Sequence, residues 1–313
     1  MVKGVGRSEL AADYYDEILF KGATFGDLVK HPGPLVVASS TDISTGARLA
    51  FSQNDFDIIC SDLAGVKLSR AAAASSAVPV VLSPLAFNNY GGSCSYEYPA
   101  WVDSTGKDGR IVSGRLQQRY REMRSFQDSA KRPYLHLVDG GVADNLGLRA
   151  VLERFRAAEA SPEFRKSLNI HRLKRTLLII VNSRSDPELN WDQSEDGPSA
   201  VALLLKSVSV PIDRNSFEAV ELMKDLLDKW KQTRERGRQE QSADDGGPQR
   251  IRLYPVVVSF EGVQDPQLRA RLMALPTTFS LPDRDVDLLR KVAGDLLRSS
   301  PEFIDFVQDL REH

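Results

Sequence analysis

The chain has 313 residues, of which 42% are hydrophobic and 27% are charged, as is ordinary for a globular protein with a sizeable core. Its formal net charge of −2 argues against nucleic-acid binding, because that function needs a basic face. No apolar run approaches the roughly 20 residues that cross a bilayer, and residues 1–7 contain no apolar segment of a signal peptide. The sequence as it stands predicts a cytoplasmic protein. The compartment stays open, because a secretory or lipoprotein signal would lie in any missing N-terminal region.

The first part of the chain alternates predicted helices with short apolar strands. Helices are expected where apolar side chains recur at helical spacing, and strands where short apolar runs lie between turn signals. Residues 35–38 are therefore expected to form a central strand, and residues 80–82 a strand or a buried extended segment. The other expected elements are helices at 10–19, 63–77 and 116–126, a short element at 25–29, a polar turn at 39–46, a strand at 49–52 and an irregular loop at 88–109.

The second part of the chain adds further strands and helices. Residues 176–182 are continuously apolar, which is typical of a strand buried on both faces of a parallel sheet. Strand, helix and strand follow one another here, so an α/β layered fold is favoured. A long helix is expected over residues 199–238, interrupted at Pro211. Its expected buried stripe is Phe217, Val220, Met223, Leu227 and Trp230. The other expected elements are a helix ending near 160, a mobile polar segment at 239–248, a strand at 251–260 and helices at 283–297 and 301–310.

Few residues are available for metal or redox chemistry. Cys60 and Cys94 form neither a disulfide framework nor a metal site. They could pair with each other, but we expect two buried thiols. No pair of histidines has metal-ligand spacing; the four are His31, His136, His171 and His313. We therefore expect no metal and no cofactor.

Residues 134–148 carry the pattern around which the chain is organised. Residues 134–138 are apolar or good strand formers, and they predict a short buried strand that ends at Asp139. We expect Gly140 and Gly141 to adopt backbone angles closed to other residues, so that the chain turns sharply after the carboxylate.

A helix should follow this turn. Asp144 or Asn145 can cap it, and its apolar residues continue from 148 to 155. The pattern places the Asp139 carboxylate at the carboxyl end of a strand, where ligands gather in open α/β sheets. The alternative is a structural aspartate that only accepts hydrogen bonds from nearby backbone amides.

Three short motifs follow one another along the chain: T-D-I-S-T-G at 41–46, A-S-S-A-V-P at 74–79 and D-G-G at 139–141. In this order and spacing they resemble the patatin-like phospholipases, which carry a T-D-x-x-T-G turn, an A-S-S-A-x-P helix end and a catalytic D-G-[GA]. The resemblance covers residues 35–150 and extends more loosely to 181. Residues 207–214 resemble the helical extension of some bacterial members.

The resemblance implies an α/β fold, a three-layer α/β/α patatin-like sheet that is partial here, followed by a helical C-terminal extension. Residues 1–182 would be the C-terminal part of the hydrolase domain, and residues 183–313 a mostly helical extension with one further strand. The implied activity is lipid acyl-ester hydrolysis by a Ser–Asp dyad, in which Asp139 accepts the serine proton directly. The implied partners are a phospholipid or similar lipid ester and a membrane surface.

The sequence lacks the nucleophile that this mechanism needs. No G-x-S-x-G elbow occurs, and the nearest approach, residues 91–95, follows the A-S-S-A-V-P motif, whereas the family's elbow precedes it. The glycine-rich oxyanion loop is also missing. We expect a truncated enzyme that is inactive as given rather than a decayed one, because Asp139 and its two glycines are intact. The alternative function is a non-catalytic lipid- or protein-binding module on the same scaffold.

Other polar residues near these motifs are expected to be structural. Ser75 and Ser76 should bond the backbone at a helix end. His136 lies three residues before Asp139 on the strand, so the two side chains should point to opposite faces. Asp42 is expected in an Asx-turn.

Two geometric expectations follow. Asp139 should face an open groove. If the elbow is missing, residues 35–37 and 71–77 should also expose apolar surface.

Overall fold

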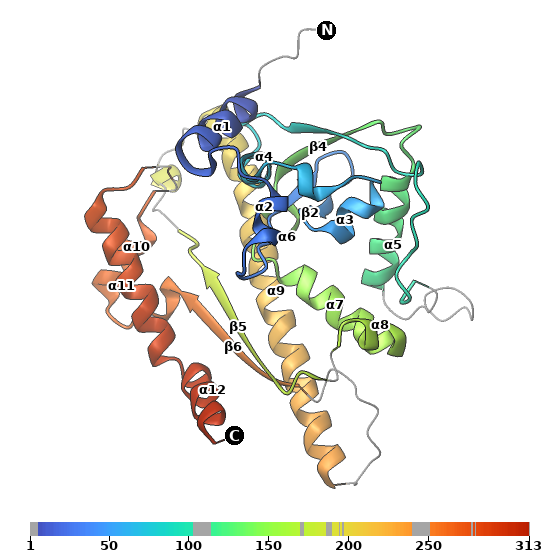
Figure 1. Ribbon diagram of the computed structural model, residues 1–313. Helices are drawn as coiled ribbons and strands as arrows, with labels where there is room; N and C mark the ends of the chain where they lie inside the picture. The colour runs from blue at the N-terminus through green and yellow to red at the C-terminus, as the bar shows by residue number, and fades with distance from the viewer. Residues whose placement is uncertain are drawn as a thin grey trace. The chain divides into compact units, whose positions relative to one another are not determined.

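A computed structural model describes residues 6–102, 114–169, 172–185, 190–193, 195, 197–239, 251–276, 278 and 280–312 (Figure 1). The chain divides into two compact units. Unit 1 comprises Met1–Phe164 and Ala200–Glu221, and unit 2 comprises Arg165–Ser199 and Leu222–His313. The protein has a mixed α/β fold, as predicted. The boundary predicted at residue 182 concerns the extent of a hydrolase domain and stays a prediction.

Unit 1 contains a four-stranded sheet whose strand order is β2-β1-β4-β3. Its strands are β1 (Ser39–Asp42), β2 (Ala47–Ala50), β3 (Leu85–Asn88) and β4 (Tyr134–Asp139). Every neighbouring pair in this sheet is antiparallel. In β4 the side chains of Leu135 and Leu137 are buried and those of Tyr134 and His136 are exposed, which is the alternation of a strand with one face on the core.

The predicted strands at 35–38 and 80–82 are wrong. Leu35 is 90% exposed, and the sheet begins only at Ser39, where the backbone finds partners in β2 and β4. Val80 adopts a positive φ of 76°, which a strand does not allow. An apolar run shows that residues avoid water, but pairing partners decide whether a strand forms. Residues 39–42, predicted as turn, form β1, and the strand predicted at 49–52 is displaced to β2.

Unit 1 also contains helices, which precede, separate and follow the strands along the chain. The helices predicted at 10–19 and 116–126 and the helix end near 160 are confirmed, and residues 63–77 divide into a 3-10 turn (Leu63–Gly65) and α4. The helices are α1 (Arg7–Tyr15) with a π turn (Asp16–Phe20), α2 (Phe25–Lys30), α3 (Gln53–Ile58), α4 (Leu68–Ser75), α5 (Gly114–Gln127), α6 (Gly141–Asp144), α7 (Leu148–Ala160) and α8 (Pro162–Ser167), the last extending into unit 2.

The core of unit 1 lies between this sheet and its helices. Phe51 packs against Phe56 with ring centroids 5.7 Å apart, and both rings are fully buried. The alanines of α4 at 71, 73 and 74 and Ala77 just after the helix are also fully buried, and the small side chains let α4 approach β1 and β4 closely. The expected apolar surface is therefore present at residues 35–37, which are exposed, and the same expectation is wrong for residues 71–77.

Unit 2 contains a parallel pair, β5 (Arg175–Asn182) and β6 (Arg252–Ser259), as the apolar run predicted. Burial on both faces is wrong, because Ile180 is buried while Val181 is 63% exposed. The carboxylate of Asp309 joins the first residues of both strands: it accepts hydrogen bonds from Arg175, from Arg252 and from Tyr254. The other elements are 3-10 turns (Asn190–Gln193 and Phe260–Gly262), α10 (Pro266–Met273), α11 (Asp283–Ser299) and α12 (Pro301–Arg311).

The long helix α9 (Ala200–Gln239) begins in unit 1 and ends in unit 2. It continues through Pro211, so the predicted interruption is wrong, although a proline removes one backbone donor from the helix. Val220, Met223 and Trp230 are buried as predicted, whereas Phe217 is 59% exposed. The mobile segment predicted at 239–248 and the end of the loop predicted at 88–109 lie largely outside the described residues.

Candidate functional site

Asp139 is the last residue of β4, and the three sequence motifs meet there. The main-chain amide of Asp139 donates to the carbonyl of Ala77 (3.0 Å), and the amide of Gly140 donates to the carbonyl of Ser75 (3.3 Å). On the other side, β1 pairs Ser40 with Asp139, and the Thr41 hydroxyl donates to the Asp139 carbonyl (2.9 Å). Segments far apart in the sequence therefore fix the backbone that carries this carboxylate.

The Asp139 carboxylate is half-buried and has a single partner. Its Oδ1 accepts a hydrogen bond of 2.6 Å from the amide of Gly141. Within the part of the chain that the structure describes, no cation and no other donor contacts this carboxylate. Its Oδ2 is not a buried atom that lacks a hydrogen-bond partner. Burial raises the pKa of Asp139, and the hydrogen bond from Gly141 opposes this shift. An accessible carboxylate oxygen with a raised pKa is suited to accept a proton.

The two glycines after Asp139 are required for space. Gly140 has φ −62° and ψ −27°, which any residue can adopt, so the expectation of unusual backbone angles is wrong. A Cβ on Gly140 would lie 2.4 Å from the carbonyl oxygen of Ser39. A Cβ on Gly141 would lie 2.9 Å from Asp139 Oδ1 and 2.7 Å from Asn145 Oδ1. The glycines let β1 and the carboxylate come close to the turn.

Asp144 caps the helix that follows, as predicted. Its carboxylate accepts hydrogen bonds from the amides of Arg149 (3.1 Å) and Ala150 (3.0 Å) in the first turn of α7. Asn145 has a different role, because its side-chain amide donates to the hydroxyl of Ser216 on α9 (3.1 Å). This contact ties the D-G-G turn to α9, and nothing in the sequence pattern indicated it.

Asp42 holds the tip of the β1–β2 hairpin, which is a structural role as expected, but the predicted Asx-turn is wrong, because no described backbone amide donates to its carboxylate and its buried Oδ1 has no hydrogen-bond partner. Its carboxylate accepts a hydrogen bond from the Thr45 hydroxyl, and Gly46 adopts a positive φ of 72°. Asp42 is also fully buried and forms an ion pair with Arg132, a partner that the sequence did not indicate.

The remaining candidates are also structural. The Ser76 hydroxyl donates to the carbonyl of Ala72 (2.9 Å) in the last turn of α4, as expected. His136 is exposed on β4. A triad through it therefore finds no support.

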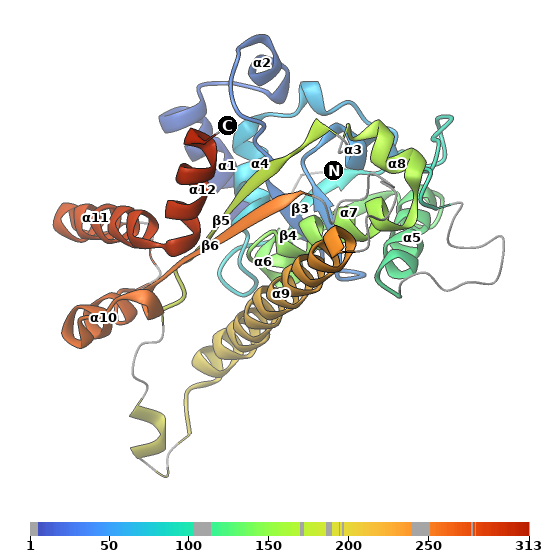
Figure 2. The ribbon, with the colours of Figure 1, turned by 90° about the horizontal axis from the view of Figure 1, so that it is seen from below.

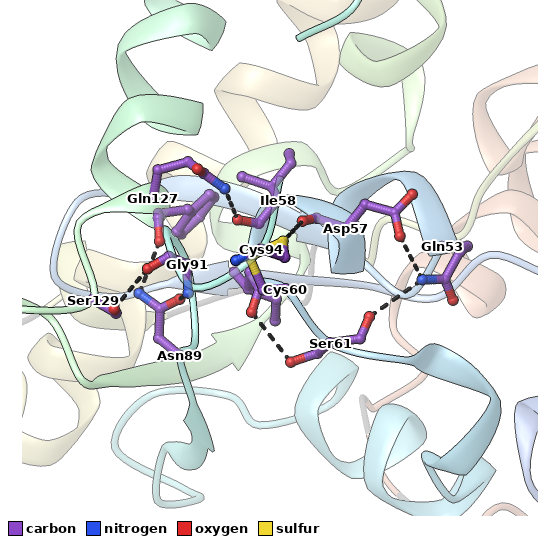
Figure 3. Close-up of a disulfide and its surroundings, with 12 residues drawn as sticks. Gln53, Asp57, Ile58, Cys60, Ser61, Asn89, Gly91, Cys94, Gln127 and Ser129 are labelled. Carbon is purple, nitrogen blue, oxygen red and sulfur yellow. Dashed lines mark hydrogen bonds between the residues drawn. A yellow bond between two sulfur atoms is a disulfide. The ribbon is translucent and has the colours of Figure 1, made fainter. Parts of the chain in front are cut away.

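The loop at residues 91–95 is fixed by a disulfide between Cys60 and Cys94 (Figure 3). The expectation of two buried thiols is wrong, because Cys60 is half-buried, Cys94 is exposed and their Cα atoms lie 5.7 Å apart. The loop is anchored further by Asn89, which donates to the carbonyl of Phe126 (2.9 Å) and accepts from the amide of Gly91 (3.0 Å). This is a tethered loop and not a nucleophile elbow, as the sequence indicated.

A pocket of about 520 Å³ lies beside this disulfide. Burial raises the pKa of Tyr96 in its wall to about 12. Asp139 is not part of this wall, so the open groove expected at Asp139 stays a prediction. Among the described residues no cluster of three metal-ligating side chains occurs, and no helix is long and apolar enough to cross a membrane. The pocket is lined by Gln53, Asp57, Cys60, Ser61, Asp62, Cys94, Ser95, Tyr96 and Glu97.

No protein-family model, no curated protein and no solved structure matches this chain. The fold and the site define a mixed α/β protein with a half-buried aspartate at a strand end, whose carboxylate is bonded by the Gly141 amide and by no cation among the described residues. The resemblance to the patatin-like phospholipases rests on the three motifs.

Proposed function

We propose that this chain carries the base of a Ser–Asp dyad in a lipid acyl-ester hydrolase of the patatin-like type. One observation carries the proposal: the three motifs of the resemblance meet at one half-buried carboxylate that has a free oxygen. The proposal includes the three-layer α/β/α arrangement of that family. The packing of α4 against β1 and β4, and of α6 against β1 and β2, supports it.

The proposed chemistry uses the two carboxylate oxygens differently. The Gly141 amide holds Oδ1, which leaves Oδ2 to take the proton of a serine hydroxyl. The serine oxygen then attacks the ester carbonyl carbon, and the same proton passes to the leaving alcohol when the acyl-enzyme forms. The raised pKa of Asp139 strengthens it as a proton acceptor. Water then attacks the acyl-enzyme by the same route and releases the fatty acid.

No described serine hydrogen-bonds to the Asp139 carboxylate, and the sequence has no G-x-S-x-G elbow. In this proposal the nucleophile and the oxyanion donors are therefore supplied by residues that precede this sequence in a longer protein. The substrate is a phospholipid or a related lipid ester, and the reaction needs no cofactor.

Activity of the longer protein tests this proposal. The coding sequence ahead of Met1 should encode a G-x-S-x-G elbow in frame, and the extended protein should hydrolyse a short-chain ester that the present chain does not. Asp139→Asn in the extended protein should lower kcat by several powers of ten, as loss of a catalytic group does in other serine hydrolases. The matched control is Asp128→Asn, the same change at an exposed position on the surface, and it should leave kcat unchanged.

The missing elbow also favours a second candidate, a non-catalytic lipid- or protein-binding module on the same scaffold. The same experiment separates the two. An upstream sequence without the elbow, or ester hydrolysis that survives Asp139→Asn, would leave the binding module as the better account.

A further inference from the structure

The first turns of α9 expose an unusually apolar surface. Val201, Leu203 and Leu204 are 62%, 57% and 53% exposed, and Val210 and Pro211 are exposed further along the helix. Figure 2 shows these turns, at the yellow end of α9, extending away from α6 and β4. Successive helical residues are turned by about 100°, so these side chains point outward in several directions rather than along one stripe.

The charges along α9 change abruptly at its fourth turn. Residues 197–212 contain a single charged residue, Lys206, and no acidic residue. From Arg214 onward most exposed positions are charged, among them Glu218, Lys224 and Asp225, although Phe217 and Leu222 are exposed too. Lys206 therefore lies within the apolar turns, residues 200–211, and Asp213 and Arg214 follow just beyond them.

The apolar turns belong to the helix that contacts the candidate site. Ser216 lies five residues after Pro211, or roughly 8 Å along the helix axis, and its hydroxyl accepts the hydrogen bond from Asn145. Asn145 in turn lies against Gly141, the residue whose amide holds the Asp139 carboxylate. The apolar turns are therefore joined through α9 to the turn that holds Asp139.

We propose that residues 200–211 of α9 insert into the acyl region of a lipid surface and hold the Asp139 site against it. This rests on the proposed function, because it supplies the way in which that site meets a lipid ester. Lys206 and Arg214 lie where they would meet the phosphate groups of the lipid surface. The helix lies in the surface rather than across it, in agreement with the lack of a spanning helix among the described residues.

The arrangement of the side chains favours lipid over a protein partner. A protein face covers one side of a helix, as a stripe of apolar residues. Here Val201 and Leu204 share one side of the helix and Leu203 leaves it on the opposite side, which is wider than one stripe and suits insertion into a fluid layer.

Co-sedimentation of the full chain with phosphatidylcholine vesicles, with and without phosphatidylglycerol, tests the proposal. The chain should bind, and more tightly when phosphatidylglycerol is present. Leu203→Glu with Leu204→Glu should weaken binding at least about tenfold, since each change removes a large apolar side chain from the lipid. The matched control is Leu35→Glu with Val36→Glu, an equally exposed apolar pair in the same unit, and it should bind as the unchanged chain does.

Three outcomes would overturn the proposal: no binding by the unchanged chain, an equal loss in the control, or a dimer that the α9 substitutions dissociate without any vesicle binding. Circular dichroism checks that each variant is folded. The Asp139→Asn chain should bind vesicles as the unchanged chain does. Failure of catalysis and failure of lipid binding are therefore distinguishable.

Discussion

The amide of Asp139 donates to the carbonyl of Ala77, so the end of β4 supplies a donor to the end of α4. The last carbonyls of a helix have no partner within the helix. Ser75 is the last residue of α4, and its carbonyl accepts a hydrogen bond from the Gly140 amide. The carbonyl of Ala77, two residues further on, accepts from the Asp139 amide. The A-S-S-A-V-P and D-G-G motifs are therefore two halves of one hydrogen-bonded junction.

Gly140→Ala should destabilise the protein by about 1–3 kcal/mol, since the new methyl group would overlap the Ser39 carbonyl. Urea unfolding measures the change. The control is Gly65→Ala, because a Cβ there meets no atom within 4 Å, and its stability should be nearly unchanged. An equal, small effect of both changes would show that β1 and the turn are not in close contact.

Thr41→Val should cost about 1–3 kcal/mol, because it removes the hydroxyl that donates to the Asp139 carbonyl, whereas the Ala143 amide keeps the Gly140 carbonyl as a second acceptor. The Thr41 hydroxyl donates to the carbonyl of Asp139 and accepts from the amide of Ala143 (3.1 Å). Thr41→Ser keeps the hydroxyl and should retain more of the stability. If serine were no better than valine in urea unfolding, packing of the threonine methyl group, and not these hydrogen bonds, would explain the loss.

Removing the disulfide should lower the free energy of unfolding by about 3–4 kcal/mol in the chain-entropy model, given its sequence separation of 34 residues. The change is Cys60→Ala with Cys94→Ala. A thiol assay of the unfolded, unreduced chain provides an independent check, and it should detect no free thiol. Two free thiols per chain would contradict the disulfide and restore the expectation of unpaired cysteines.

The sequence predicted the local pattern around Asp139 well. The strand, the glycine turn and the cap by Asp144 all depend on residues close in the chain, and local propensity is sufficient for these. It failed for the strand at residues 35–38, because apolar character is local whereas pairing is not. The partners of Ser40, which lie in β2 and in β4 far along the chain, show that Ser40 and not Leu35 belongs in the sheet.

The candidate site was predictable only where it depends on residues close together in the sequence. Asp139 and its glycines stand in one motif, but the reason for Gly140 is the approach of Ser39, which no local pattern contains. The pairs Asp42–Arg132 and Asn145–Ser216 each join distant segments, and a single sequence offers no signal for either pair. The sequence leaves the Cys60–Cys94 disulfide open, because the spacing of two cysteines does not report their distance in the fold.

Asp139→Asn should stabilise the isolated chain at neutral pH, on the order of 0.5–1 kcal/mol. The asparagine oxygen can still accept the Gly141 hydrogen bond, and the substitution removes the cost of a half-buried charge. Because the pKa of Asp139 is raised in the folded protein, the folded state holds this proton more tightly than the unfolded state. The stability of the unchanged chain therefore falls as pH rises from the unfolded pKa through the folded pKa. Below that pH window, the difference in the free energy of unfolding between the Asp139→Asn chain and the unchanged chain should shrink. A difference that grew at low pH would contradict a raised pKa of Asp139.

The pKa of Asp139, measured by NMR of its side-chain carboxyl carbon in the isolated chain, tests the central claim most directly. Asp27 provides an internal reference with the opposite shift, because the Lys30 ammonium and the backbone and hydroxyl of Thr24 lower its pKa to about 2. The account predicts that Asp139 titrates above the value of about 3.9 for an unperturbed aspartate, and that its signal is missing from the Asp139→Asn spectrum. A pKa at or below that of an unperturbed aspartate would mean a carboxylate held by structural partners, and would contradict its assignment as a base.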